Sequence, residues 1–103
     1  MKKIIDGRMY NTETAKEVAK LTSNGIYSRS DFRWKEETLY LKKTGEFFIY
    51  GEGGPMTEYA RHVDNGRMWG ESIIPMTKFE AKRWVERNCE ADVYVELFGE
   101  VKE

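Results

Sequence analysis

The chain has 103 residues, of which 34% are charged and 40% hydrophobic, and its formal net charge is -1. This length accommodates one hydrophobic core but no separate substrate domain, so we expect residues 1–103 to form a single domain. Because basic residues do not outnumber acidic ones, the composition argues against binding of nucleic acid by bulk charge. Cys89 is the only cysteine, which excludes an intrachain disulfide, and no apolar stretch has the length of a signal-peptide core or a membrane span. We therefore expect a cytoplasmic protein.

The N-terminal part of the chain predicts a hairpin followed by a helix. Residues 3–10 place short extended pieces on either side of an Asp-Gly turn, which favours a small hairpin. Apolar residues then recur at helical spacing behind an N-cap at Asn11 or Thr12. We expect this first helix to cover residues 12–21 and to end before Asn24-Gly25.

The central part of the chain predicts mainly strands. Strand-forming residues on both sides of a Thr-Gly turn predict an antiparallel hairpin over residues 37–50. The stretch 56–63 is ambiguous and favours one short helix, because Tyr59 and Val63 stand at helical spacing. Residues 64–66 predict a turn, and residues 68–74 predict a strand that stops at the following proline.

The C-terminal part of the chain predicts helices. Thr77 and Glu80 form a capping box at the start of a helix over residues 78–89, whose apolar face comprises Ala81, Trp84, Val85 and Cys89. Asp92 is the candidate N-cap of a last short helix that holds Val93, Tyr94, Leu97 and Phe98, although Val93-Tyr94-Val95 would also suit a strand. The predicted fold class is α+β, with a small antiparallel sheet packed against one or two main helices.

The glycine-rich stretch Gly51-Glu52-Gly53-Gly54-Pro55 directly follows the strand-forming run 47–50. A phosphate-binding loop requires a lysine and a hydroxyl residue after its last glycine, and Pro55-Met56 stand there instead. The spacing of the dinucleotide-binding motif is not met either. Two interpretations remain: the glycines open a docking surface, or they let the strand and the loop pack closely.

Candidate partner-binding residues surround this glycine-rich stretch. Tyrosine, tryptophan and arginine supply most of the binding energy at protein interfaces. The candidates are Tyr50, Glu52, Tyr59, Arg61, Arg67 and Trp69. If their rings face solvent, this corner of the fold is a docking surface; if they are buried, it belongs to the core.

Catalytic and metal chemistry have little support in the sequence. His62 is the only histidine, which rules out a metal site built on several imidazoles. Cys89 could act as a nucleophile with His62, but its place on an apolar helix face is typical of a buried structural thiol. We expect a protein that is not an enzyme and that needs neither metal nor cofactor.

A second mixture of aromatic and basic side chains precedes the predicted 37–50 hairpin. It comprises Tyr27, Arg29, Phe32, Arg33, Trp34 and Lys35. Such a mixture can stack bases while pairing phosphates. Since the net charge is not basic, we favour the alternative in which Phe32 and Trp34 close the core and the charges are solvated.

One set of short segments covers nearly the full length of the chain: residues 6–15, 31–32, 37–40, 45–48, 51–55, 74–77, 80–81 with Trp84, and 98–100. This set resembles a family of small proteins from gut bacteria and their phages that includes a type II-A anti-CRISPR, an inhibitor of the nuclease Cas9. The resemblance implies a small domain that binds Cas9 or its guide-RNA complex, and it carries over no active-site residue. A small nucleic-acid-binding or regulatory accessory protein of a mobile element is the alternative hypothesis.

Overall fold

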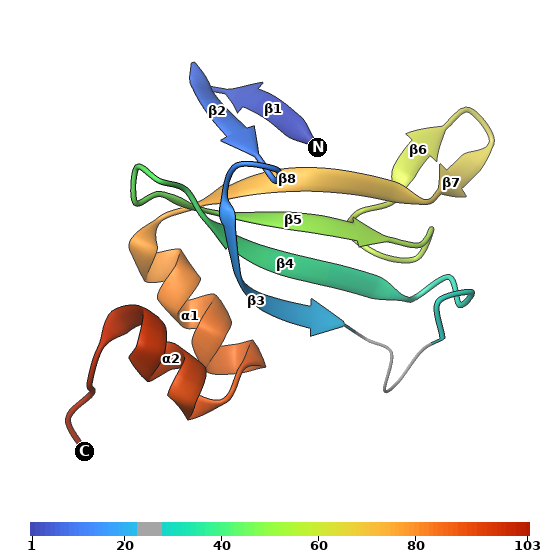
Figure 1. The fold of residues 1–103 in the computed structure, drawn as a ribbon. Helices are drawn as coiled ribbons and strands as arrows, with labels where there is room; N and C mark the ends of the chain where they lie inside the picture. The colour runs from blue at the N-terminus through green and yellow to red at the C-terminus, as the bar shows by residue number, and fades with distance from the viewer. Residues whose placement is uncertain (23–27) are drawn as a thin grey trace.

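The computed structural model describes residues 1–22 and 28–103, and a four-stranded antiparallel sheet forms the centre of this part of the chain (Figure 1). Across the sheet the strands follow the order β3 (Lys16–Thr22), β4 (Lys35–Leu41), β5 (Phe47–Gly53) and β8 (Gly70–Met76). The predicted hairpin 37–50 is confirmed as β4 and β5. Aromatic and branched residues occupy the halves of the two strands next to the turn, Thr38–Leu41 and Phe47–Tyr50, which suits a pleated surface buried on both sides.

One face of the sheet, the helix face, packs against α1 (Lys78–Asn88) and α2 (Ala91–Phe98). The cluster between the two layers joins residues of β4, β5 and α1, all 8% exposed or less: Leu39, Phe47, Ile49, Ala81, Trp84 and Val85. Phe98 of α2 adds its ring beside Phe47, with centroids 5.6 Å apart. The predicted α+β fold, with the Ala81, Trp84 and Val85 face of the helix on the sheet, is confirmed.

The opposite face of the sheet, the hairpin face, is half covered by β1 (Lys2–Ile5) and β2 (Arg8–Asn11), which confirm the hairpin predicted at residues 3–10. Asp6 and Gly7 between these strands have φ of 52° and 77°, as a tight two-residue hairpin turn requires. Tyr10 anchors the hairpin: its ring lies edge-on to the buried ring of Phe48 at 5.5 Å.

The capping box of α1 is confirmed. The Thr77 hydroxyl accepts a hydrogen bond from the Glu80 amide at 3.0 Å, and the Glu80 carboxylate accepts one from the Thr77 amide at 2.8 Å. The short C-terminal helix is confirmed as α2, but its N-cap is Glu90 and not Asp92. Neither helix of the described chain is long and apolar enough to cross a membrane.

The helix predicted over residues 12–21 is wrong, because this segment contains the edge strand β3. A β-bulge shifts the pairing with β4 between Glu17 and Ala19. The bulge interrupts the alternation of inward and outward side chains, so Val18 and Ala19 are both half-buried. This interruption produced the apparent helical spacing. Asn24-Gly25, the predicted helix end, lies outside the described residues.

The short helix predicted over residues 56–63 is also wrong. Residues 55–59 form turns, and the chain then enters β6 (Arg61–Val63), which pairs with β7 (Gly66–Met68). The turn predicted at 64–66 is confirmed between these two strands, although its glycine is already part of β7. The strand predicted over 68–74 is shifted: β8 begins at Gly70 and continues through Pro75 to Met76.

The place of Pro75 in the sheet explains why β8 does not stop there. Gly54 donates its amide hydrogen bond to the Trp34 carbonyl, so even-numbered positions of β5 bond toward β4 and odd-numbered positions toward β8. Pro75 is paired with Phe48, an even-numbered position. Its nitrogen, which has no hydrogen to donate, therefore lies on the outer edge of the sheet and leaves the ladder with β5 intact.

Truncation of Trp84 tests the packing of α1 on the sheet. We expect Trp84→Ala to lower the free energy of unfolding by about 3–5 kcal/mol, because a large ring is lost from a buried cluster. Phe79→Ala on the same helix is the matched control: this ring is 67% exposed and its loss should change stability by about 0.5 kcal/mol or less. Equal melting temperatures for Trp84→Ala and the wild type would contradict the packing.

The pKa of Glu46 tests how the β1–β2 hairpin is tied to the β4–β5 turn. Hydrogen bonds from Lys42, Arg8 and Thr44 lower this pKa from its ordinary value of 4.5 to about 2. A lowered folded-state pKa stabilises the fold above pH 4.5, and that contribution disappears as the pH falls toward 2. In an NMR carboxyl titration, Arg8→Gln should raise the pKa of Glu46, whereas Arg33→Gln, which removes the partner of Asp31, should leave it unchanged.

Candidate functional site

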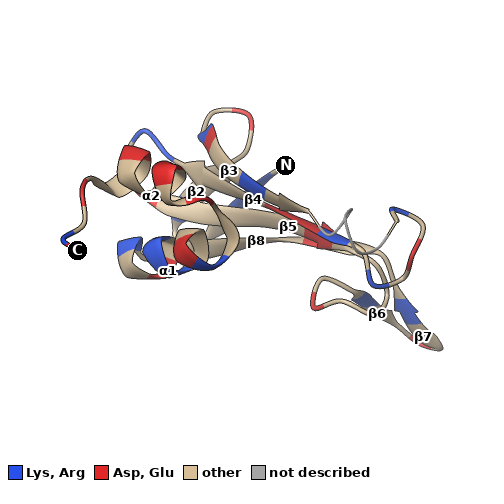
Figure 2. Ribbon diagram, turned by 90° about the horizontal axis from the view of Figure 1, so that it is seen from below, with Lys and Arg blue, Asp and Glu red and all other residues tan. Residues whose placement is uncertain are grey.

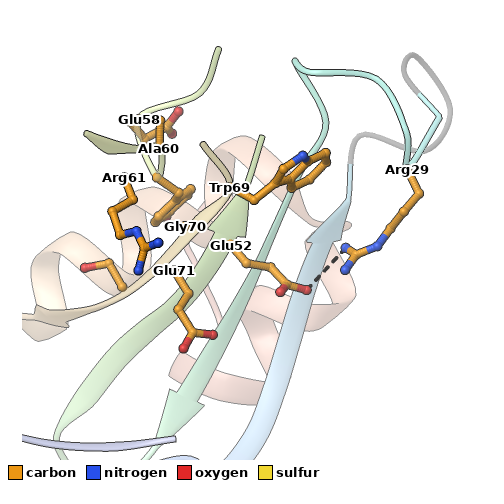
Figure 3. Close-up of a pocket in the computed structure, with 10 residues that line it drawn as sticks. Arg29, Glu52, Glu58, Ala60, Arg61, Trp69, Gly70 and Glu71 are labelled. Atoms are coloured by element: carbon orange, nitrogen blue, oxygen red, sulfur yellow. Dashed lines mark hydrogen bonds and ion pairs between the residues drawn. The ribbon is translucent and has the colours of Figure 1, made fainter. Parts of the chain in front are cut away.

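An open pocket of about 730 Å³ lies at the end of the sheet where β8 begins, beside the β6–β7 hairpin (Figure 3). We call it the corner pocket. Its walls combine charged and aromatic side chains from the loop before β4, from β5, from the loop before β6, from β6, from the junction of β7 and β8, and from β8. Among them are Arg29, Glu52, Tyr59, Arg61, Trp69 and Glu71. The volume falls within the range of pockets that bind ligands or partner side chains.

Of the two alternatives left open for the rings at this corner, Tyr59 takes the buried one, at 5% exposure. It lies on the helix face of the sheet directly over Gly51, where a side chain would leave no room. A Cβ atom at Gly51 would stand 2.0 Å from Cζ of the Tyr59 ring. The Tyr59 ring thus excludes any side chain at position 51, which explains the glycine there.

Close packing also accounts for the neighbouring glycines. A Cβ at Gly53 would meet the Thr57 hydroxyl at 2.4 Å, and one at Gly54 would meet the Phe32 carbonyl oxygen at the same distance. Neither of these two glycines has a positive φ, so the conformational freedom of glycine is not what these positions use. Of the two interpretations of the glycine-rich stretch, the geometry supports close packing.

The carboxylate of Glu37 fixes the loop that carries Tyr59. This carboxylate accepts a hydrogen bond from the Tyr59 hydroxyl through one oxygen and from the Trp84 indole nitrogen, at 3.2 Å, through the other. Burial, together with the adjacent Glu37 charge, raises the pKa of Tyr59. Tyr59 therefore stays a neutral donor, and the β5–β6 loop is joined through Glu37 to α1.

Three glutamates form a row across the hairpin face at the rim of the corner pocket. Glu36, Glu52 and Glu71 are direct neighbours on β4, β5 and β8. Like charges in adjacent positions destabilise a sheet unless partners offset them. The Lys20 ammonium lies 3.5 Å from the Glu36 carboxylate, and the Tyr50 hydroxyl donates to Glu71. Burial and this hydrogen bond raise the pKa of Tyr50.

Arg29 supplies the cation for Glu52, the central glutamate of the row. Its guanidinium lies 3.4 Å from the Glu52 carboxylate, as the dashed line in Figure 3 marks. The same guanidinium stacks 4.1 Å from the centre of the Trp34 ring and 5.9 Å from that of Trp69. Trp34 is buried, at 1% exposure, whereas Trp69 is 38% exposed. Trp69 thus has a partly exposed ring whose position is restrained by Arg29 and Trp34.

The structure brings four of the six predicted site residues to the corner pocket: Glu52, Tyr59, Arg61 and Trp69 line it. Tyr50 touches it indirectly through Glu71. Arg67 does not line it, and its guanidinium donates to the Thr57 carbonyl at 3.3 Å. The part that each of these residues has in binding a partner stays a prediction.

Sequence reasoning missed Glu71 and gave Arg29 no place in this site. Glu71 lies at the pocket because β8 pairs with β5. This pairing joins segments that are distant in sequence, so no local sequence pattern predicts it. Arg29 belongs to the aromatic and basic mixture before β4, where the expectation of core rings is right for Trp34 and wrong for Phe32, which is 58% exposed. Tyr27 of that mixture lies outside the described residues.

The groups that could support catalysis are spread out. His62 lies on the exposed strand β6, at the opposite end of the molecule from Cys89 at the end of α1 (Figures 1 and 2). Burial raises the pKa of the Cys89 thiol, which disfavours the reactive thiolate. Within residues 1–22 and 28–103, no group of three or more His, Cys, Asp or Glu side chains could hold a metal ion.

Comparison with protein-family models, with curated proteins and with solved structures finds no match to this chain. The assignment of a function therefore depends on the geometry of the corner pocket.

A double-mutant cycle tests the contact between Gly51 and Tyr59. Gly51→Ala alone should lower the free energy of unfolding by about 1–3 kcal/mol, because the new methyl group collides with the ring. In a Tyr59→Ala background the same change should cost less by about 1 kcal/mol or more, since the ring is gone. Additive costs in denaturant melts would show that the two positions do not meet.

Proposed function

We propose that this protein acts by binding a macromolecular partner through the corner pocket, without catalysing a reaction. One observation carries the proposal. Trp69, 38% exposed, stands in an open pocket between the guanidinium-bearing residues Arg29 and Arg61. Tryptophan and arginine at the centre of a concave patch are the typical anchors of protein interfaces. The tryptophan is positioned in advance by Trp34, whose ring centre lies 6.1 Å away, which reduces the ordering cost of binding.

We further propose that the partner is Cas9 or its guide-RNA complex in the cytoplasm of the bacterial host. The likeness to anti-CRISPR proteins supports this assignment. The physical properties agree with it: a small domain without a cofactor can inhibit a nuclease by covering a functional surface. The charges around Trp69 are mixed, with Glu52 and Glu71 beside Arg29 and Arg61. This arrangement complements the mixed charges of a protein partner better than the uniform negative charge of a nucleic acid.

Size-exclusion chromatography with a type II-A Cas9 tests this function most directly. Purified chain is mixed with Cas9 alone, with the Cas9–guide-RNA complex and with duplex DNA, and DNA cleavage by the complex is measured in parallel. We expect the chain to co-elute with a Cas9-containing species and to reduce cleavage. Co-elution with duplex DNA but with neither Cas9 species would contradict the proposal and favour the nucleic-acid-binding accessory protein.

Removal of the Trp69 ring localises the interface. We expect Trp69→Ala to weaken partner binding by about 2 kcal/mol or more, as interface hot spots do, while stability changes by about 1 kcal/mol or less. Ile4→Ala is the matched control, because Ile4 is 66% exposed on the distant hairpin strand β1. Unchanged binding by Trp69→Ala, or an equal loss in both variants, would place the interface elsewhere.

A further inference from the structure

The outer surface of α1 carries a concentration of positive charge. Figure 2 shows Lys and Arg together with some acidic residues on α1, and Asp and Glu on α2 beside it. Helix α1 has four basic residues against two acidic ones, Glu80 and Glu86. We call the cations of α1 the basic face; they are Lys78, Lys82, Arg83 and Arg87. None of them forms an ion pair with any residue of the ranges 1–22 and 28–103. The cations of the basic face are therefore available to bind an external anion.

An exposed ring accompanies two of these cations. Phe79, Arg83 and Arg87 follow one another at intervals of four residues, which places them along one side of the helix. The Phe79 ring is 67% exposed, and the Arg83 guanidinium lies 5.7 Å from its centre. Aromatic faces next to arginines are the combination with which proteins stack bases and pair phosphates.

A second cavity, of about 520 Å³, borders this ring and these arginines on the helix face of the sheet. Its carboxylates are engaged within the protein. The Glu58 carboxylate pairs with the Lys35 ammonium at 2.6 Å, Glu80 caps α1 through Thr77, and Glu37 is hydrogen-bonded as described above. With three carboxylates and three cations the cavity lining has no net charge. Arg83 and Arg87 are its cations without an ion pair among described residues, so these two guanidinium groups, and not the cavity as a whole, are what would attract phosphate.

We propose that the basic face and this cavity bind a segment of single-stranded nucleic acid, with phosphates on Arg83 and Arg87 and a base stacked on Phe79. A single strand satisfies both features, because its bases are free to stack, whereas a duplex keeps its bases paired and offers mainly phosphates. An acidic protein segment would use the arginines as well, so the test below includes a polyglutamate peptide. None of these three residues lines the corner pocket, so this inference does not depend on the proposed function.

Fluorescence anisotropy with labelled oligonucleotides of about 12 nucleotides tests the site. Single-stranded RNA and single-stranded DNA share the recognised chemistry, and their separate titrations show which source binds more tightly. We expect Arg83→Gln/Arg87→Gln to weaken binding about tenfold or more and to reduce the slope of log K against log salt by about 1.4, the value for two lost phosphate contacts. Phe79→Ala should weaken binding about tenfold with little change in that slope.

Matched controls separate this local site from general attraction. Lys2→Gln/Lys3→Gln removes the same charge from exposed β1 and should leave the affinity within about twofold. All the substituted side chains are exposed, so melting temperatures should match the wild type. An equal loss in the two double variants, equal affinity for duplex and single strand, tighter binding of a polyglutamate peptide, or no oligonucleotide binding at about 50 mM salt would each overturn the proposal.

Discussion

Hydrogen bonds to the carboxylate of Glu37 hold together the walls of both the corner pocket and the cavity beside α1. Three elements that are distant in sequence meet at its oxygens: its own strand β4, the loop that carries Tyr59, and the helix that carries Trp84. Both donors are neutral and directional, and among residues 1–22 and 28–103 no salt bridge joins this carboxylate. Tyr59 forms a wall of the corner pocket and Trp84 a wall of the cavity beside α1. One half-buried carboxylate thus sets the shape of both surfaces proposed to bind partners.

The elements predicted correctly are those whose sequence signals are local. The hairpin β4–β5 and the capping box of α1 depend on residues at most a few positions apart, where strand propensity, turn and cap all agree. The first predicted helix failed for the opposite reason. The apolar residues of segment 12–21 belong to an edge strand with a β-bulge. The alternation of inward and outward side chains that is typical of a strand becomes visible only once the pairing with β4 is known. The short predicted helix around Tyr59 failed because one side chain, drawn into the space over Gly51, determines the path of that loop.

The candidate site was predictable in position but not in composition. The glycine-rich stretch does border the corner pocket. The reason for its glycines, however, lies in residues outside the stretch, whose atoms occupy the space where a Cβ would stand. Trp69 and Arg61 were identified by residue type, because aromatic rings and arginines recur at interfaces. Glu71 could not be found in this way, since the β6–β7 hairpin separates it in sequence from its neighbour Glu52. Long-range strand pairing, and not local pattern, decides which charges share a surface.

Both outer strands of the sheet carry an irregularity, β8 at its free edge and β3 in its pairing with β4. On β8, Pro75 turns a nitrogen without a hydrogen toward the outside, and on β3 the bulge near Ala19 twists the backbone away from regular pairing. An incoming strand from another molecule would therefore find one donor missing on β8 and a locally twisted backbone on β3, both of which disfavour pairing. These irregularities disfavour the addition of a fifth strand from another molecule. They therefore reduce edge-to-edge aggregation when the protein reaches a high concentration.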